Sequence, residues 1–322
     1  MRSIAIARYL LKRLALLIPL AIGVTLVVFV LQSLIPGGPI AAILQGKSAP
    51  AETVAALEAK FYLDRPLYEQ YWIWLSHAVQ GNLGISIRTS QPVSAAIGQR
   101  LGVTLILNMV GMVLCLAIGV PMGIIAAYRR GGWIDRFVVG INVFWSSAPH
   151  FVTAIVALFV FGYTLRWFPI LGLGDGSASD LARHLVLPCI IMALGPLGFI
   201  TRLTRAAMLE NLSEDYVTFA RARGLGFWEV LRKYTLRNSL VPIITGIGLL
   251  LIGLLTGTVF VETVFGIPGL GGLLVSSVTN VDFPVVQGLV LFFAGYIILA
   301  NLIIDFTYTL VDPRVGFGQV AR

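Results

Sequence analysis

The sequence has 322 residues, of which 57% are hydrophobic and only 12% are charged. Soluble globular domains carry about 25% charged residues, so this composition excludes an ordinary soluble domain and favours a membrane protein. The formal net charge is +8. The distribution of Lys and Arg around the apolar segments accounts for that charge, so it does not indicate a nucleic-acid-binding surface.

Six segments are apolar over about the 20 residues that a helix needs to cross a bilayer. They are Leu14–Leu34, Val103–Ala127, Phe137–Tyr163, Leu185–Leu203, Leu240–Val261 and Val285–Val311. Pro188 and Pro196 interrupt the fourth segment, which a membrane helix tolerates when neighbouring helices satisfy the freed carbonyls. We therefore predict an all-α membrane protein with six transmembrane helices.

The basic residues predict how these helices are oriented. An even number of spans places both termini on one side of the membrane, and sixteen of the 23 Lys and Arg residues fall on that side. They are Arg2, Arg8, Lys12, Arg13, Arg129, Arg130, Arg136, Arg202, Arg205, Arg221, Arg223, Arg232, Lys233, Arg237, Arg314 and Arg322. Because basic residues concentrate in cytoplasmic loops, we expect both termini to be cytoplasmic. Leu14–Leu34 is too long for the apolar part of a signal peptide, so we expect it to be retained as a helix.

The predicted spans divide the chain into four parts. We expect an N-terminal transmembrane helix in residues 1–35, an extracytoplasmic region in 36–101, a five-helix core in 102–312 and a cytoplasmic tail in 313–322. The extracytoplasmic region holds a helical stretch near Ala51–Tyr62 and an aromatic run, Tyr68–Trp74. Such aromatic side chains commonly lie at the headgroup level, so an interfacial anchor or local core is favoured over a substrate-stacking platform.

The sequence holds no pattern typical of a catalytic site. Gly46-Lys47-Ser48 resembles the end of a phosphate-binding loop, but that motif needs a Gly where Ala41 stands. The three histidines lie in separate segments without metal-ligand spacing, and the two cysteines both fall in apolar spans. We therefore expect no catalytic residue, no metal site and no cofactor bound by this chain.

Two carboxylates and two glycine patterns fall in or beside the spans. An intramembrane carboxylate is a candidate proton relay, but Glu262 borders an outer loop and Asp305 lies near the cytoplasmic end of its span. A structural role is therefore favoured for both. Gly119–Gly123 and Gly253–Gly257 let helix backbones approach closely, which fits either packing within this chain or contact with another subunit.

A charged segment, Glu210–Tyr234, separates the fourth and fifth spans. Gly224 lies at its middle, where one helix can end and another begin. Apolar side chains such as Phe219 and Trp228 give this cytoplasmic loop more apolar surface than solvation favours, which indicates contact with a partner. The alternative is a loop that lies on lipid headgroups with its Arg side chains on phosphates.

This loop resembles the EAA loop of ABC importer permeases, whose general form is E-A-A-x3-G-x9-I-x-L-P. The matching positions are Ala220, Gly224 and Leu236. Thr218, Phe219, Tyr234 and Arg237 stand where the general form has Glu, Ala, Ile and Pro. The sequences of Tyr216–Leu225 and Leu236–Pro242 are similar to those of the dipeptide, oligopeptide and nickel branch of these permeases, which carries the same differences from the general form.

Three further segments are similar to that branch: Arg8–Leu14, Val261–Gly271 and Asp282–Pro284. The resemblance covers nearly the whole chain and implies the first of two permease subunits of a peptide-type importer, with the type I ABC importer permease fold. It also implies a multi-pass protein of the bacterial or archaeal cytoplasmic membrane, in contact with lipid. The implied partners are a second homologous permease, two cytoplasmic ATPases that hold ATP and Mg²⁺, and an extracytoplasmic substrate-binding protein.

The resemblance also assigns site residues. In such permeases the EAA loop, here within residues 205–239, couples the membrane helices to an ATPase. The residues assigned to coupling are Asp215, Tyr216, Ala220, Arg221, Arg223, Gly224, Leu225 and Gly226. The residues assigned to an outer gate or to binding-protein contact are Glu262, Phe265, Pro268, Gly269, Gly271 and Asp282. A short helix is expected between them, near Leu270–Thr279.

Two classes of function remain open at this point. The first is an ABC importer permease, which transports nothing without its partners. The second is a secondary carrier or channel driven by an ion gradient, for which midplane charges or inverted repeats would be expected. The sequence contains neither of these features. Within the first class, dipeptides, longer peptides, glutathione-like molecules and nickel chelates are all possible substrates.

Overall fold

The computed structural model of the protein describes residues 18–19, 21–34, 40, 44 and 49–311. Every regular element in this part of the chain is a helix, and the one strand-like pairing there is an isolated bridge between Ile85 and Pro92. The all-α prediction is therefore confirmed for these residues. Segments Arg8–Leu14 and Gly46–Ser48, the tail 313–322 and the side chain of Asp305 lie outside the described part.

The chain divides into two compact units, Met1–Gly102 with Pro268–Leu299 and Val103–Ile267 with Ala300–Arg322. The first unit contains an N-terminal helix (Ala21–Ser33), α3 (Ala51–Lys60), α4 (Leu67–Val79), the start of α5 (Val93–Tyr128), α12 (Leu270–Thr279) and most of α13 (Phe283–Val311). The sequence predicted helices near Ala51–Tyr62 and Leu270–Thr279, and both are confirmed.

In the first unit, Tyr71 attaches α4 to the N-terminal helix. Its ring lies 5.5 Å from that of Phe29, and its hydroxyl donates a hydrogen bond of 3.0 Å to the carbonyl of Ile22. Tyr68 and Trp72 of the same aromatic run are exposed. The run therefore supplies local core at Tyr71. A second apolar cluster joins the start of α5 to α12 and α13.

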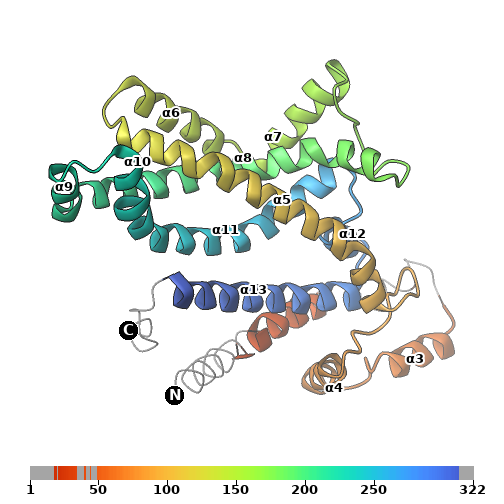
Figure 1. The fold of residues 1–322 in the computed structure, drawn as a ribbon. Helices are drawn as coiled ribbons and strands as arrows, with labels where there is room; N and C mark the ends of the chain where they lie inside the picture. Colours follow the sequence, from red (N-terminus) through yellow and green to blue (C-terminus); the bar gives the residue numbers. More distant parts are fainter. Residues whose placement is uncertain (1–17, 20, 35–39, 41–43, 45–48, 312–322) are drawn as a thin grey trace. The chain divides into compact units, whose positions relative to one another are not determined.

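The second unit is built around one long helix, α8 (Ala178–Leu212), which contacts α6, α7 and α11. Its elements are the rest of α5, α6 (Trp133–Ser147), α7 (His150–Ala157), the π-helical turn η1 (Leu158–Thr164), α8, α9 (Asp215–Ala222), α10 (Phe227–Val230), the π-helical turn η2 (Leu231–Leu236), α11 (Arg237–Val264) and the end of α13. Figure 1 shows α9 and α10 together at one end of this unit. Both Pro188 and Pro196 lie inside α8, which stays a single helix.

Glycines of α5 allow it to lie directly against α8. A Cβ atom added at Gly123 would lie 2.6 Å from Cβ of Thr204 and 2.7 Å from the carbonyl oxygen of Thr201. Gly119 faces Ile200 of the same helix in a similar way. The Gly119–Gly123 pattern therefore serves packing within this chain, one of the two alternatives that the sequence left open.

In the part of the chain that the structure describes, four helices are long and apolar enough to cross a membrane: Val93–Tyr128, Ala178–Leu212, Phe227–Val264 and Phe283–Ile304. A fifth span is present if Trp133–Ser147 and His150–Thr164 count as one, although the two halves are bent by 96°. The segment Phe137–Tyr163, predicted as one span, is therefore divided between two helices. Pro149 explains the break, because a proline pushes the residue before it out of the helical region, and Ala148 has an extended backbone with ψ 128°.

We expect Gly123→Ala to destabilise the protein, because its methyl group would overlap α8. Overpacking of this kind costs about 1–3 kcal/mol. Gly102→Ala is the matched control in the same helix, since a Cβ atom there meets nothing within 4 Å. Without a clash, Gly to Ala in a helix stabilises by roughly 0.5–1 kcal/mol. Thermal unfolding in detergent should therefore shift down for Gly123→Ala and not for Gly102→Ala. An equal upward shift in both variants would contradict the close approach.

Candidate functional site

Gly224 ends α9 in the way that the sequence predicted. It adopts φ +79°, a left-handed conformation that glycine takes without steric cost. The N–H of Gly224 donates to the carbonyl of Arg221 (2.9 Å), and the N–H of Leu225 donates to that of Ala220 (3.3 Å). These two bonds form a Schellman motif, which satisfies helix-end carbonyls and reverses the chain. Gly226 then caps α10, so the loop is helix, glycine, helix.

The loop has a small apolar core of its own. Val217 and Ala220 of α9 are buried against Val230 of α10, and Leu225 packs against this cluster. In contrast, Phe219 and Trp228 leave 68% and 67% of their surface exposed. Large apolar side chains on the outside of a folded charged loop form a surface suited to contact with another molecule.

Polar side chains fix the base of the loop to the two long helices. The Tyr216 hydroxyl donates to Oδ1 of Asn211 at the end of α8 (2.6 Å). The amide nitrogen of Asn211 donates to Oγ of Ser239 in α11 (3.1 Å). Ser239 is fully buried and also bonds the carbonyl of Ala207. The position of α9 therefore depends on α8 and α11 together. Asn211 and Ser239 were not predicted from the sequence, since single polar residues at helix ends carry no signal by themselves.

An ion pair fixes α6 to α8 at the same end of the unit. Nε of Arg205 lies 2.7 Å from Oδ1 of Asp135, and its Nη2 lies 2.8 Å from Oδ2. The N–H of Gly131 donates to Oδ2 as well (2.9 Å). A bidentate guanidinium and carboxylate pair restricts orientation as well as distance, so it holds the two helices in one register. The sequence analysis counted Arg205 only as a topological signal.

The eight residues assigned to coupling therefore lie in one compact loop, in three kinds of environment. Asp215, Arg221, Arg223, Gly224 and Gly226 are exposed, Tyr216 and Leu225 are half-buried, and Ala220 is buried. Ala220 was among the residues assigned to coupling with an ATPase. Its burial against Val217 and Val230 shows that its small size serves the packing of the loop itself.

The six residues assigned to the outer face are mostly buried. Glu262, Phe265, Gly269, Gly271 and Asp282 are buried, and Pro268 is exposed. Glu262 accepts a hydrogen bond of 2.6 Å from the hydroxyl of Thr104, which joins α11 to α5. The carbonyl of Phe265 accepts a bond of 2.9 Å from the N–H of Gly172. These contacts give Glu262 and Phe265 a part in the internal structure of the second unit.

Asp282 holds a loop of the first unit against the turn between α12 and α13. Its carboxylate accepts hydrogen bonds from the hydroxyl of Ser86 (2.5 Å) and from the N–H groups of Ile87 (3.1 Å) and Arg88 (3.4 Å). The preceding residue, Val281, has φ +57°, a conformation that β-branched residues rarely adopt. The buried carboxylate therefore stabilises a strained turn and the 86–88 loop at once.

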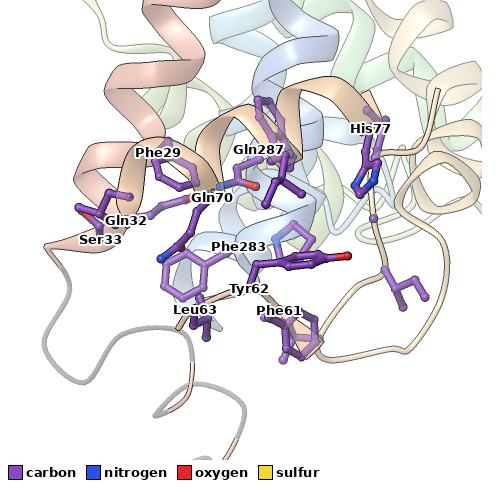
Figure 2. A pocket seen from close by; sticks show the side chains of 18 of the residues that line it. Phe29, Gln32, Ser33, Phe61, Tyr62, Leu63, Gln70, His77, Phe283 and Gln287 are labelled. Carbon is purple, nitrogen blue, oxygen red and sulfur yellow. Dashed lines mark hydrogen bonds between the residues drawn. The ribbon is translucent and has the colours of Figure 1, made fainter. Parts of the chain in front are cut away.

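A cavity of about 420 Å³ lies in the first unit, between the N-terminal helix, α4 and the start of α13. Figure 2 shows the rings of Phe29, Phe61, Tyr62 and Phe283 and the amides of Gln32, Gln70 and Gln287 around it. Gln287 donates a hydrogen bond of 2.9 Å to Gln32. No Lys or Arg is among the described residues that line the cavity, so an anion would meet no counter-charge there. No group of three or more potential metal ligands lies together among the described residues either.

Comparisons with known proteins place this geometry in context. Residues 119–317 match the family described as binding-protein-dependent transport system inner membrane component, and residues 6–108 match the N-terminal family of such membrane components. A putative peptide permease protein of Brucella suis is 40% identical over 314 residues, which cover 96% of this chain and 98% of that protein. The glutathione transport system permease protein GsiC of Escherichia coli is 38% identical over 96% of this chain and 99% of its own length. Among solved structures, the inward-facing MetNI methionine ABC transporter matches with TM-score 0.53 and 20% identity, over 67% of this chain and 96% of that one, which shows a shared fold.

We expect Asp282→Asn to release the 86–88 loop. Hydrogen bonds to a charged group contribute about 1.5–3 kcal/mol and those to a neutral group about 0.5–1.5 kcal/mol, so the neutral amide should hold the loop roughly tenfold less well. Trypsin cleavage after Arg88 in the detergent-purified protein measures the opening. Asp64→Asn, at an exposed residue of the same unit, is the control. Unchanged cleavage in Asp282→Asn would mean that the carboxylate does not hold the loop.

Proposed function

The chain belongs to the family of binding-protein-dependent transport system inner membrane components, and from this membership we propose that it forms half of the path by which an ATP-driven importer carries peptides. It is a transport subunit and not an enzyme. Relatives named as peptide permeases, aligned over nearly the full length of both chains, support the peptide substrate. The exposed helix–glycine–helix loop at the end of α8 is the structural observation that supports coupling to an ATPase.

The proposed topology has six membrane helices with both termini in the cytoplasm. It counts the N-terminal helix, the four long helices and the bent pair of α6 with α7 and η1 as spans. Residues 1–35 are the first span, 36–101 the extracytoplasmic region, 102–312 the core and 313–322 the cytoplasmic tail. The excess of Lys and Arg on the side of α9 and α10 supports this orientation, since such residues concentrate in cytoplasmic loops.

Two cytoplasmic ATPases and a second homologous permease complete the proposed complex in a bacterial or archaeal cytoplasmic membrane. The loop from Asp215 to Gly226 enters a groove of one ATPase. Phe219 and Trp228, which follows the loop in α10, are the apolar anchors, with Arg221 and Arg223 as exposed charges around them. ATP and Mg²⁺ are held by the ATPases. Nucleotide-driven closure of the ATPases moves the loop, and the loop moves α8 and α11, to which Asn211 and Ser239 attach it.

On the opposite face, an extracytoplasmic binding protein delivers the substrate. Of the six residues assigned to that face, exposed Pro268 is the one placed to touch another molecule directly, and buried Asp282 acts by holding the 86–88 loop. Ser277 is buried in α12, whereas its neighbour Val278 is 57% exposed. A crosslinking probe for the binding protein therefore belongs at Val278.

We expect Gly224→Val to uncouple transport. A β-branched residue at φ +79° costs about 1–3 kcal/mol, so the turn between α9 and α10 should open and misplace both helices. Substrate-stimulated ATP hydrolysis by the reconstituted complex should fall by about tenfold or more. Gly226→Ala is the control, because Gly226 has φ −66°, which any residue can adopt. Normal stimulation in Gly224→Val would count against this loop as the coupling element.

The energy source gives a separate prediction. Uptake into proteoliposomes that hold this chain and its partner permease should require the ATPases and ATP, because the chain has no complete phosphate-binding loop. A proton gradient alone should drive no uptake. Gradient-driven uptake that Asp305→Asn abolishes would refute the ABC importer and support a proton-coupled carrier.

A further inference from the structure

The break between α6 and α7 lies beside a cavity in the second unit. Its volume is about 310 Å³, and its lining comes from α7, α8 and α11. The lining residues are His150, Met192, Gly195, Pro196, Phe199, Leu249, Leu250, Gly253, Leu254 and Gly257. None of them is charged, so the cavity is largely apolar. Three are glycines, so helix backbone without side chains forms part of its lining.

Two polar groups without their usual partners border this apolar space. Nδ1 of His150 is buried and has no hydrogen-bond partner among the described residues. Gly195 makes room for the imidazole, since a Cβ atom there would overlap the ring. Pro196 lies inside α8 and has no N–H to give to the carbonyl of Met192, four residues earlier. At this apolar cavity, one ring nitrogen is therefore without a partner, and the carbonyl of one lining residue is without the donor that a regular helix would supply.

We propose that this cavity is where the transported peptide contacts this chain, with its amide groups hydrogen-bonded to His150 and to the carbonyl of Met192. The inference rests on the proposed function and adds the contact site in this chain and the kind of peptide that fits it. Broken membrane helices at the middle of the bilayer commonly form substrate sites in transporters, because the break frees backbone groups where a solute can reach them. The volume suits a side chain with its flanking amides, since ligand sites begin at about 300 Å³.

The uncharged lining decides which peptides fit. Burial of a charge without a partner in an apolar site is costly, whereas an amide can hydrogen-bond Nδ1 of His150 and the carbonyl of Met192. The cavity therefore favours a neutral, apolar side chain of the peptide, whose charged termini must lie outside the apolar space, over substrates with several carboxylates, such as glutathione or metal chelates. A side chain of the partner permease is the competing occupant, but an apolar side chain would leave Nδ1 of His150 unsatisfied.

The test uses the complete importer in proteoliposomes: this chain, its partner permease, the ATPases and the binding protein. The probes are radiolabelled dialanine and leucylphenylalanine. Gly253→Leu fills the cavity without a backbone clash, since a Cβ atom at Gly253 meets nothing within 4 Å. Uptake of leucylphenylalanine should fall roughly tenfold and that of dialanine by less than about twofold, as expected for lost space in an apolar pocket. Gly295→Leu in α13 is the matched control, where a Cβ atom also meets open space.

His150→Phe tests the polar contact separately, because it keeps a ring of similar shape and removes both nitrogens. The KM for uptake of both dipeptides should rise roughly threefold to tenfold, the factor expected for one lost hydrogen bond. His150→Gln, which can still hydrogen-bond an amide, should recover part of that rise. If the ring had only a structural role, the KM of His150→Phe would equal that of the unaltered complex, and this result would contradict the hydrogen bond.

The outcomes separate this inference from the proposed function. One outcome is that the unaltered complex takes up both dipeptides and that neither Gly253→Leu nor His150→Phe changes this uptake. That outcome would refute the cavity as a peptide site but not the proposed importer. Loss of the partner permease from the Gly253→Leu complex in size-exclusion chromatography would show a subunit contact and also refute it. Failure of the unaltered complex to transport either dipeptide would refute the peptide importer itself.

Discussion

Close approach of helix backbones to α8 is the constraint on which the second unit depends. Lipid provides no hydrophobic drive between helices, so association relies on packing and on groups small enough to permit it. Gly119 and Gly123 of α5 supply that contact from one side, and Gly198 of α8 supplies it toward Asn142 of α6. As a result α8 is 61% buried over its most apolar window, against 33% for each of the other three long helices.

This buried helix continues directly into the helix–glycine–helix loop. Leu212 ends α8 and Asp215 begins α9, while α10, η2 and α11 run on as one helix of 38 residues from Phe227 to Val264. Both ends of the loop are thus extensions of helices that pack against each other. A displacement of α9 must be shared with α8 and α11, because Asn211 and Ser239 join all three. The coupling that we propose therefore has a contiguous physical route.

Sequence patterns predicted what depends on local chemistry. The lengths of the apolar segments predicted the long helices. Gly224 predicted the turn after α9, because that turn requires only a left-handed backbone conformation at one residue. Burial within the loop was not predictable in this way, since it depends on which face α9 turns inward. Ala220 was assigned to a partner and lies inside, whereas Phe219 one position earlier is exposed. The role of Asp282 depends on Ser86, almost two hundred positions away in the chain, which no local pattern shows.

The prolines show the same limit most clearly. Pro149, Pro188 and Pro196 all interrupt apolar segments, and the sequence gives no reason to treat the first differently. Pro188 and Pro196 lie in α8, where contacts with α6, α7 and α11 hold the helix on several sides. Around Pro149 the large side chains Phe144 and Phe151 are exposed, so less packing opposes a break there. Tertiary contacts therefore decide whether a proline breaks a membrane helix, as at the 96° bend beside Pro149, or lies inside a continuous helix, as in α8.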